Sequence, residues 1–310
     1  MKFALKICLF LAFFTLSTNA QTVFEFLKLD ASPRTAALAG SFVAGNDDPN
    51  VIFYNPAGIA GLKETPVSFS FVKHLLDVNM AALSGSYNFE GIGRFGAGIQ
   101  YINYGSFNEI TEDGIKTGEF KVADFAMTLG YSNFLDSNFS YGVNAKFIYS
   151  GIQERSSTAL AFDIGLLYEL RESNLSFGLS VQNIGNQITA YYETKEDLPL
   201  DIRFGFAKQF TGVPLKFYFS FNQLNEKNDD FFSRFQNYTF GAEIKLSKVL
   251  KTRLGYNSRL HKDLKIGTTA GLAGLNLGFG ITAGNYIVDY TFTSLGPVGS
   301  MHRFGLSTSF

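Results

Sequence analysis

Hydrophobic and polar residues alternate along most of the chain from residue 66 onward. In one such segment Leu215, Phe217 and Phe219 share a face, and Lys216 and Ser220 lie on the opposite face. A period of two residues is typical of a β-strand with one apolar and one polar side. The pattern therefore predicts a protein built of antiparallel strands.

The alternating pattern divides into fourteen segments, most of them about as long as a tilted membrane-spanning strand. We expect strands at 66–75, 80–89, 93–104, 119–131, 139–151, 157–170, 174–183, 199–209, 214–223, 236–247, 250–258, 271–282, 285–294 and 301–310. The pattern is weakest between 271 and 294 because glycines interrupt it there.

The links between these segments also alternate in length. Links after the even-numbered segments are short, whereas those after the third, seventh, ninth and eleventh are long and polar: 105–118, 184–198, 224–235 and 259–270. Successive links of an antiparallel barrel lie at opposite ends. All the long links follow odd-numbered segments, so they share one end. Short periplasmic turns and long extracellular loops are typical of transmembrane barrels.

Composition favours an exterior that faces lipid. The 310 residues are 46% hydrophobic and only 17% charged, against about 25% charged in an average soluble domain. The chain has no run of about 18 apolar residues, which is the length that a membrane-spanning helix requires. The net charge of −1 argues against a nucleic-acid partner. We predict an all-β, 14-stranded antiparallel transmembrane β-barrel in contact with outer-membrane lipid. A soluble barrel with an apolar interior is the alternative.

The first twenty residues have the features of a secretory signal. Lys2 and Lys6 flank the start of an apolar stretch over 7–16, and we expect cleavage before Gln21. The one cysteine, Cys8, lies in this segment. The mature chain would then hold no disulfide, cysteine nucleophile or thiolate metal site.

The last strand ends on a phenylalanine. Arg303, Gly305 and Phe310 resemble the C-terminal signal that the barrel-assembly machinery recognises in bacterial outer-membrane barrels, although Thr308 stands where an apolar residue is usual. The resemblance implies localisation in the cell outer membrane.

Residues 21–65 do not alternate and are predicted to form a separate segment before the barrel at 66–310. A short helix is expected from Ser32 to Gly40, with a serine cap, Pro33 at the first position and a closing glycine. Farther along, Pro56 restricts Asn55 to an extended conformation.

The segment before the barrel carries a family resemblance. Phe26-Leu27, the stretch from Arg34 to Gly40, Asp47-Asp48 and Tyr54-Asn55-Pro56-Ala57-Gly58 resemble the N-terminus of FadL-like outer-membrane proteins. Within these, the chain is most similar to the PorV/PorQ family associated with type IX secretion. The resemblance implies a fourteen-stranded barrel with 21–65 as a small plug inside the lumen. The plug motif consists of Arg34, Gly40, Asn55, Pro56, Ala57 and Gly58.

Catalytic and cofactor patterns are not convincing in this sequence. Residues 91–96 match the glycine pattern of dinucleotide sites, but a strand follows where a helix is required. The acidic residues at 47 and 48 lack calcium-loop spacing. His74, His261 and His302 show no spacing that announces a nucleophile. We expect no enzyme activity, no cofactor and no metal.

The polar face expected to line the lumen carries charges of both signs. A selective pore would carry a ring of one sign, so we expect the charges to pair with one another or with the plug. The positive residues are Lys146, Arg203, Lys216, Lys245, Lys251, Arg253 and Arg303, and the negative ones are Asp124, Asp163, Glu169, Asp201, Glu243 and Asp289.

Two long loops carry paired aromatic residues beside charges. Tyr191 and Tyr192 lie in 188–198, and Phe231 and Phe232 lie in 225–235. Such residues are typical of protein docking surfaces. They are equally typical of the aromatic girdles at membrane interfaces, and both interpretations stay open.

Two functions are compatible with these features. The PorV/PorQ resemblance implies a non-enzymatic barrel that engages secretion-system or surface proteins through its extracellular loops. FadL-like uptake of hydrophobic molecules is the alternative, and it requires an apolar pocket. The inward positions look mainly small and polar, although 51–54 of the plug could line such a pocket. The sequence therefore favours the secretion interpretation.

Overall fold

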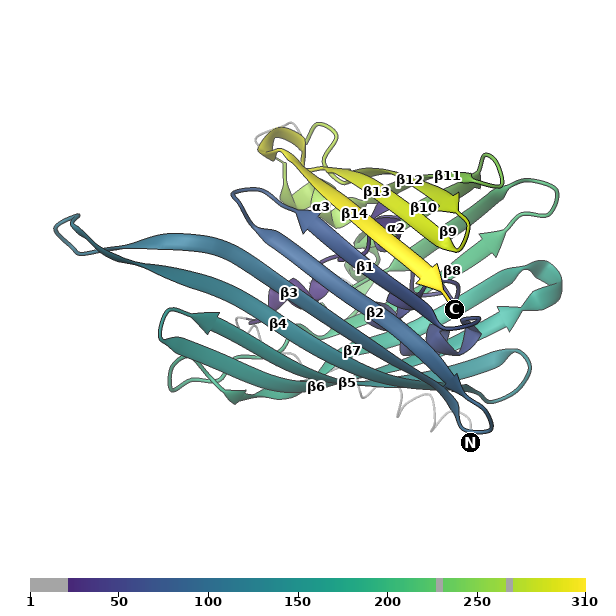
Figure 1. Ribbon diagram of the computed structural model, residues 1–310, viewed down its shortest axis with the longest axis horizontal. Coiled ribbons are helices and arrows are strands. Elements are labelled where there is room, and N and C mark those ends of the chain that lie inside the picture. The colour runs from purple at the N-terminus through teal and green to yellow at the C-terminus, as the bar shows by residue number, and fades with distance from the viewer. Residues whose placement is uncertain (1–21, 227–230, 266–269) are drawn as a thin grey trace.

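A closed barrel of fourteen antiparallel strands forms the body of the molecule (Figure 1). This computed structural model describes residues 22–226, 231–265 and 270–310, so the predicted signal at 1–20 lies outside the described residues. Each strand pairs with its neighbours in the sequence, and β1 closes on β14. The predicted fold class is confirmed.

The strands follow one another without crossovers. Their bounds are β1 Pro66–Lys73, β2 Asn79–Phe89, β3 Gly93–Ile110, β4 Lys116–Phe134, β5 Phe139–Ile152, β6 Arg155–Leu170, β7 Leu175–Thr189, β8 Asp201–Gln209, β9 Leu215–Phe221, β10 Tyr238–Lys245, β11 Leu250–Asn257, β12 Leu275–Ala283, β13 Tyr286–Ser294 and β14 Ser300–Ser309.

The apolar sides of the strands face outward. In β3, Phe95 and Ile99 are 42% and 38% exposed, whereas the inward Gln100 is 4% exposed. A soluble barrel would show the reverse. Since lipid offers the backbone no hydrogen-bond partners, a closed sheet is one of the few structures that can cross a membrane.

The prediction of a long link at 105–118 is wrong. There β3 and β4 continue as a paired ribbon, and only 111–115 connect them. A bulge near Gly105, which has a φ of +89°, shifts the register at the base of this ribbon. The ribbon projects beyond the neighbouring strands (Figure 1), where no lipid imposes an apolar face, and its sequence therefore lacks clear alternation.

Other element bounds also differ from the prediction. The strand expected at 271–282 begins only at Leu275, after a turn in which Gly271 and Gly274 have positive φ. The link at 184–198 is partly strand, because β7 continues to Thr189. Two other long links contain short helices, η6 at Phe231–Gln236 and α3 at Ser258–Asp263.

The remaining helices are all short. They are η2 Glu25–Lys28, α2 Pro33–Ala37, η3 Pro49–Phe53, η4 Pro56–Gly61, η5 Arg171–Ser173 and η7 Gly296–Val298. Throughout the described ranges, no helix has the length and apolar character needed to cross a membrane.

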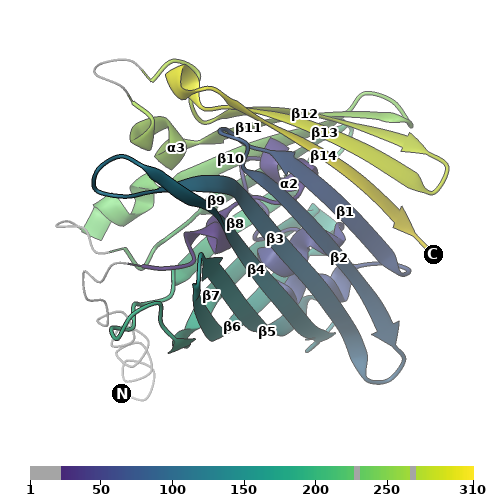
Figure 2. The same cartoon turned by 60° about the vertical axis from the view of Figure 1, so that its left-hand side comes forward.

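Residues 22–65, which we call the plug, pass through the lumen (Figure 2). Thr22 forms a parallel bridge with Asp197, in the loop between β7 and β8 at the long-loop end. At the short-turn end, the Thr65 amide donates to the Phe310 carbonyl at 3.0 Å. Between these points α2 contacts β11 to β14, and η3 and η4 contact β1 to β6.

Glycines on the inner wall let the plug lie directly against the strands. A Cβ atom at Gly142 would overlap Pro56, and one at Gly241 would lie 2.8 Å from the Leu38 Cβ. We call this set the glycine belt: Gly96, Gly98, Gly130, Gly142, Gly165, Gly178, Gly205, Gly241, Gly255, Gly278 and Gly305. The plug therefore fills the space that inward side chains would otherwise occupy.

Replacing Gly142 with leucine should loosen the plug. The new side chain would overlap the Pro56 backbone, and overpacking of this kind typically costs about 1–3 kcal/mol. We expect the gel-mobility transition of the heated protein to occur at lower temperature, and residues 22–65 to be cleaved faster by added protease.

The matched control is Val143→Leu, since the neighbouring Val143 is outward and 45% exposed. It should leave both measurements unchanged. Equal behaviour of Gly142→Leu and Val143→Leu would contradict the close packing of plug and wall.

Candidate functional site

An apolar cluster lies inside the barrel toward the long-loop end. The wall of β1 to β6 contributes its inward apolar residues, and the start of the plug contributes two phenylalanines. We call it the inner apolar cluster: Phe24, Phe26, Ala31, Val72, Met80, Ala82, Ile102, Ala126, Ile148, Ala159, Ala161 and Leu198. Val23, Leu27, Val78 and Tyr104 pack against it.

Strand register brings the wall residues of the cluster together. Val72 pairs with Met80, and Met80 pairs with Ile102, so the three form one row across β1, β2 and β3. In the next row Ala126 pairs with Ile148. Ile102 and Ile148 are fully buried. These few large apolar residues gather at one end of a lumen whose other inward positions are mainly small and polar, as expected.

Phe24 and Phe26 occupy the inner apolar cluster from the plug side. Phe24 precedes η2 and has a φ of +59°, an uncommon conformation for a bulky residue. The segment is tied to the long-loop end by the hydrogen bond from the Val23 amide to the Asp197 carbonyl. Two buried aromatic rings thus fill the site, and the backbone conformation of Phe24 costs on the order of 1–3 kcal/mol.

Two polar groups border the cluster. The Asp124 carboxylate accepts hydrogen bonds from the Tyr104 hydroxyl at 2.7 Å and from Ser150. The Arg303 guanidinium donates to the Asp30 carbonyl at 3.0 Å and to the Thr293 hydroxyl at 2.6 Å. Both side chains are buried, so their hydrogen-bond partners replace the water that the charges have lost.

A second apolar cluster lies lower, within and beneath the plug. Leu38, Phe42, Val51, Ile52, Tyr54 and Ile59 are among its buried members, and the wall contributes Leu167, Ala207 and Tyr218. Ile52 and Ile59 lie against Gly96 and Gly130 of the glycine belt. Residues 51–54, which were expected to be available for lining a ligand pocket, instead pack the plug onto the wall.

Ion pairs connect the plug to β9 and β10, and the pair between Arg34 and Glu243 is buried. Arg34 contacts Glu243, with Nε and Oε2 3.0 Å apart, and it also contacts Asp47, with Nη2 and Oδ2 3.1 Å apart. Lys216 Nζ lies 3.1 Å from the same Asp47 oxygen, and Arg253 pairs with Glu243 at 2.6 Å. We call these residues the Arg34 network. The predicted pairs between lumen and plug are therefore present.

The Arg34 network sets the protonation state of the plug carboxylate. Burial acts to raise the pKa of the Asp47 carboxyl, but the positive charges of Arg34 and Lys216 hold that pKa well below its usual value. A lowered pKa stabilises the folded state at pH values above the usual aspartate pKa of about 3.9. This stabilisation is lost only as the pH falls through the lowered pKa. The ion pairs of Asp47 with Arg34 and Lys216 are consequently intact at neutral and mildly acidic pH.

The predicted plug-motif residues make specific contacts. Gly40 has a φ of +73°, and Asn55 Nδ2 donates to the Val43 carbonyl at 2.7 Å and to Leu166 of the wall at 3.1 Å. Pro56 begins η4. The Ala57 carbonyl accepts hydrogen bonds from two wall serines, and a Cβ at Gly58 would overlap the Gly45 carbonyl. These contacts join the plug to the wall.

The predicted assembly-signal residues lie on β14 and at its end. Arg303 is inward and buried, and a Cβ at Gly305 would lie 2.8 Å from Pro33. Phe310 is exposed beyond the strand. Recognition by the assembly machinery stays a prediction, since Arg303 and Gly305 also have roles inside the finished barrel.

The aromatic loop residues differ in exposure, and Tyr191 is half-buried and interacts with Ser150 of the wall. Tyr192 and Phe232 are 71% and 74% exposed. The Arg155 guanidinium lies 4.3 Å from the Tyr192 ring centre and donates to the Tyr191 carbonyl. Phe231 begins η6. Their role in partner contact also stays a prediction.

No group of three or more metal-ligating side chains forms among the residues that the structure describes. The inner apolar cluster is therefore the candidate site, and the sequence interpretation missed it. The signal was Ile148, a large apolar residue on the otherwise polar face of β5, between the outward Phe147 and Tyr149.

Solved structures with a similar fold are outer-membrane barrels. The Ralstonia pickettii toluene transporter TbuX matches with a TM-score of 0.60 and 12% identity, covering 90% of this chain and 98% of that one. The Pseudomonas putida toluene transporter TodX has a TM-score of 0.55 and 13% identity, covering 93% and 98%.

A Pseudomonas aeruginosa FadL homologue has a TM-score of 0.55 and 11% identity, covering 90% of this chain and 98% of that one. The chain has the fold of FadL-type outer-membrane barrels. This FadL-type barrel is therefore placed in the cell outer membrane. No protein-family model and no curated protein matches the sequence.

Replacing Arg34 with methionine should release the plug of this FadL-type barrel. The change would leave Glu243 and Asp47 with fewer partners, and removal of one member of a buried pair typically costs about 3–5 kcal/mol. We expect ion conductance in planar bilayers to rise above that of the unchanged protein.

Lys73→Met provides the control, because the Lys73–Asp77 pair is exposed and exposed pairs contribute about 0–1 kcal/mol. It should leave conductance unchanged. If Arg34→Met conducts no more than Lys73→Met, the Arg34 network does not hold the plug.

Proposed function

We propose that this barrel carries hydrophobic small molecules across the outer membrane and binds them in the inner apolar cluster. The observation that supports the proposal is the apolar wall formed by Val72, Met80, Ile102 and Ile148 on the inside of a membrane barrel. Lumen positions that only face water have no need of such residues. Burial of an aromatic or alkyl group there is favourable by roughly 25 cal/mol per Å² of apolar surface.

The two phenylalanines of the plug indicate the kind of molecule that fits. Phe24 and Phe26 already place apolar rings in the cluster, and a hydrocarbon of similar size would make the same contacts. The Thr22 bridge and the hydrogen bond from the Val23 amide to the Asp197 carbonyl tie the start of this segment to the loop. Exchange of a ring for a ligand therefore leaves the Arg34 network intact.

The structural neighbours favour the same function. TbuX and TodX are described as toluene transporters, and CymD, with a TM-score of 0.56, as a monoaromatic hydrocarbon channel. None is described as an enzyme, which agrees with a non-enzymatic role. Toluene and related hydrocarbons are the first compounds to test.

Protein secretion of the PorV/PorQ type is the second candidate function. The exposed Tyr192 and Phe232 at the long-loop end are residues of the kind that docking surfaces use. This function predicts that surface-exported proteins co-purify with the barrel. Exchange of the loops 184–198 and 224–235 should then abolish their recovery.

Binding of an apolar fluorescent probe tests the transport proposal. With N-phenylnaphthylamine and detergent-solubilised protein, Ile148→Asn should weaken binding about tenfold, which corresponds to about 1.4 kcal/mol, because it adds an amide to the apolar wall. Phe24→Ala should strengthen binding, because it vacates space in the cluster.

Opposite effects of the two variants distinguish a binding site from general loss of stability. Toluene should compete with the probe in the unchanged protein. If the protein binds neither compound, or if both variants behave like the unchanged protein, hydrophobic transport through the inner apolar cluster is wrong.

A further inference from the structure

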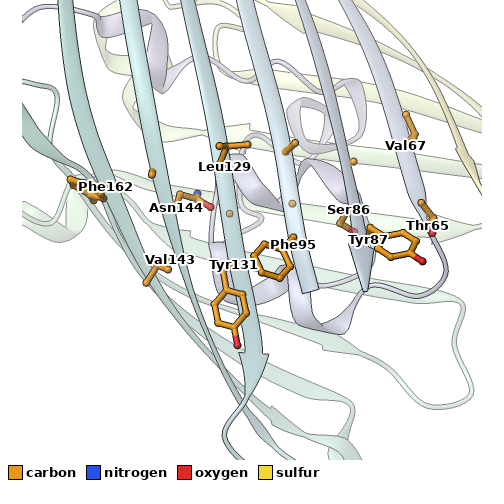
Figure 3. Close-up of a pocket in the computed structure, with 15 residues that line it drawn as sticks. Thr65, Val67, Ser86, Tyr87, Phe95, Leu129, Tyr131, Val143, Asn144 and Phe162 are labelled. Carbon is orange, nitrogen blue, oxygen red and sulfur yellow. The ribbon is translucent and has the colours of Figure 1, made fainter. Parts of the chain in front are cut away.

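The lipid-facing side of the barrel carries a groove of about 730 Å³ across β1 to β6. Figure 3 shows it from outside, with the plug behind the strands. Most of the side chains that line it are outward and apolar, including Val67, Ala97, Leu129, Val143 and Phe162. This groove is separate from the inner apolar cluster.

Strand register explains why the wall is hollowed here. One row of outward residues runs through Gly85, Ala97, Leu129 and Ala145 on β2 to β5, and three of these four are small. The row on one side consists of large residues, Leu83, Ile99, Met127 and Phe147. The row on the other side consists of Tyr87, Phe95, Tyr131 and Val143. The small row is thus a channel between two raised rows, and the exposed side chain of Leu129 lies in it between Ala97 and Ala145.

The floor of the groove is rigid. Behind it, the inward Gly96 and Gly130 lie directly against Ile52 and Ile59 of the plug. The wall at this height is therefore supported from inside and cannot relax inward. A rigid, preformed surface loses little conformational freedom when a flexible chain settles on it.

The position of the groove identifies what covers it. It faces the membrane and lies near the short-turn end, because the Tyr131 hydroxyl donates to the Ile92 carbonyl in the β2–β3 turn at 2.8 Å. That end is periplasmic in transmembrane barrels. Tyr87 and Tyr131 line the groove on that side, and tyrosine hydroxyls prefer the polar boundary of a bilayer.

We propose that the groove is a specific binding site for one phospholipid of the periplasmic leaflet. An acyl chain fills the channel over Gly85, Ala97 and Ala145, and the glycerol region lies beside the hydroxyls of Tyr87 and Tyr131. The proposal does not depend on hydrophobic transport, since the groove lies outside the barrel.

Filling the channel tests the site. The variant Ala97→Leu/Ala145→Leu keeps the surface apolar but removes the hollow, and Ala242→Leu places the same residue at an outward position on β10. Native mass spectrometry of protein purified in dodecyl maltoside with added phosphatidylethanolamine should show one retained lipid in the unchanged protein and in Ala242→Leu. Retention by the filled variant should be about tenfold lower.

A second measurement avoids reliance on that variant. The chain contains no tryptophan, so Phe162→Trp gives a single, selectively excited tryptophan at the groove, and Phe240→Trp gives one at an outward site on β10. Phosphatidylethanolamine with brominated acyl chains, added to the detergent micelles, should quench the groove tryptophan at a lower lipid-to-detergent ratio than the β10 tryptophan. Quenching of both at the same ratio, or undiminished lipid retention by Ala97→Leu/Ala145→Leu, would overturn the proposal.

Discussion

The pairing of β1 with β14 is the constraint on which the rest of the structure depends. Lipid cannot satisfy backbone hydrogen bonds, so a sheet in a membrane must close on itself. From Pro66↔Ser309 to Lys73↔His302 the two end strands pair without a break. Closure divides every strand into a lipid face and a lumen face. It also creates an interior that must be filled or wetted, and the plug fills much of it.

Two kinds of contact divide the interior. At plug height, the wall presents glycines, and the plug backbone lies directly on the strands. The Arg34 network adds charge pairs, and removal of Arg34 would leave Glu243 paired with Arg253 alone and Asp47 with Lys216 alone. Toward the long-loop end, the wall presents Ile102 and Ile148, and the first part of the plug, around Phe24 and Phe26, packs in the same cluster. The part of the plug that contacts the glycine belt and the Arg34 network thus closes the lumen. The segment around Phe24 and Phe26 lies over the apolar wall.

Alternation predicted the barrel because lipid contact imposes a period of two wherever a strand crosses the membrane. It failed at 105–118, where β3 and β4 continue as a paired ribbon beyond the neighbouring strands. It also concealed the inner apolar cluster, since large apolar residues such as Ile148 occur singly on strand faces that are otherwise small and polar. The inward glycines were part of a face described as small and polar. Only the folded plug shows which of its atoms lie against each glycine. Arg34 was identified as a plug residue, but its partner Glu243 lies 209 positions away.

The central claim is that the barrel binds apolar molecules inside the lumen, in the inner apolar cluster. Crystals soaked with bromobenzene test it most directly, because anomalous scattering locates the bromine without reference to any assay. The account predicts a bromine peak among Ile102, Ile148 and Met80, with Phe24 or Phe26 displaced and Arg34 still paired with Glu243. Bromine peaks confined to the outer surface of the barrel, with both phenylalanines in place, would contradict it.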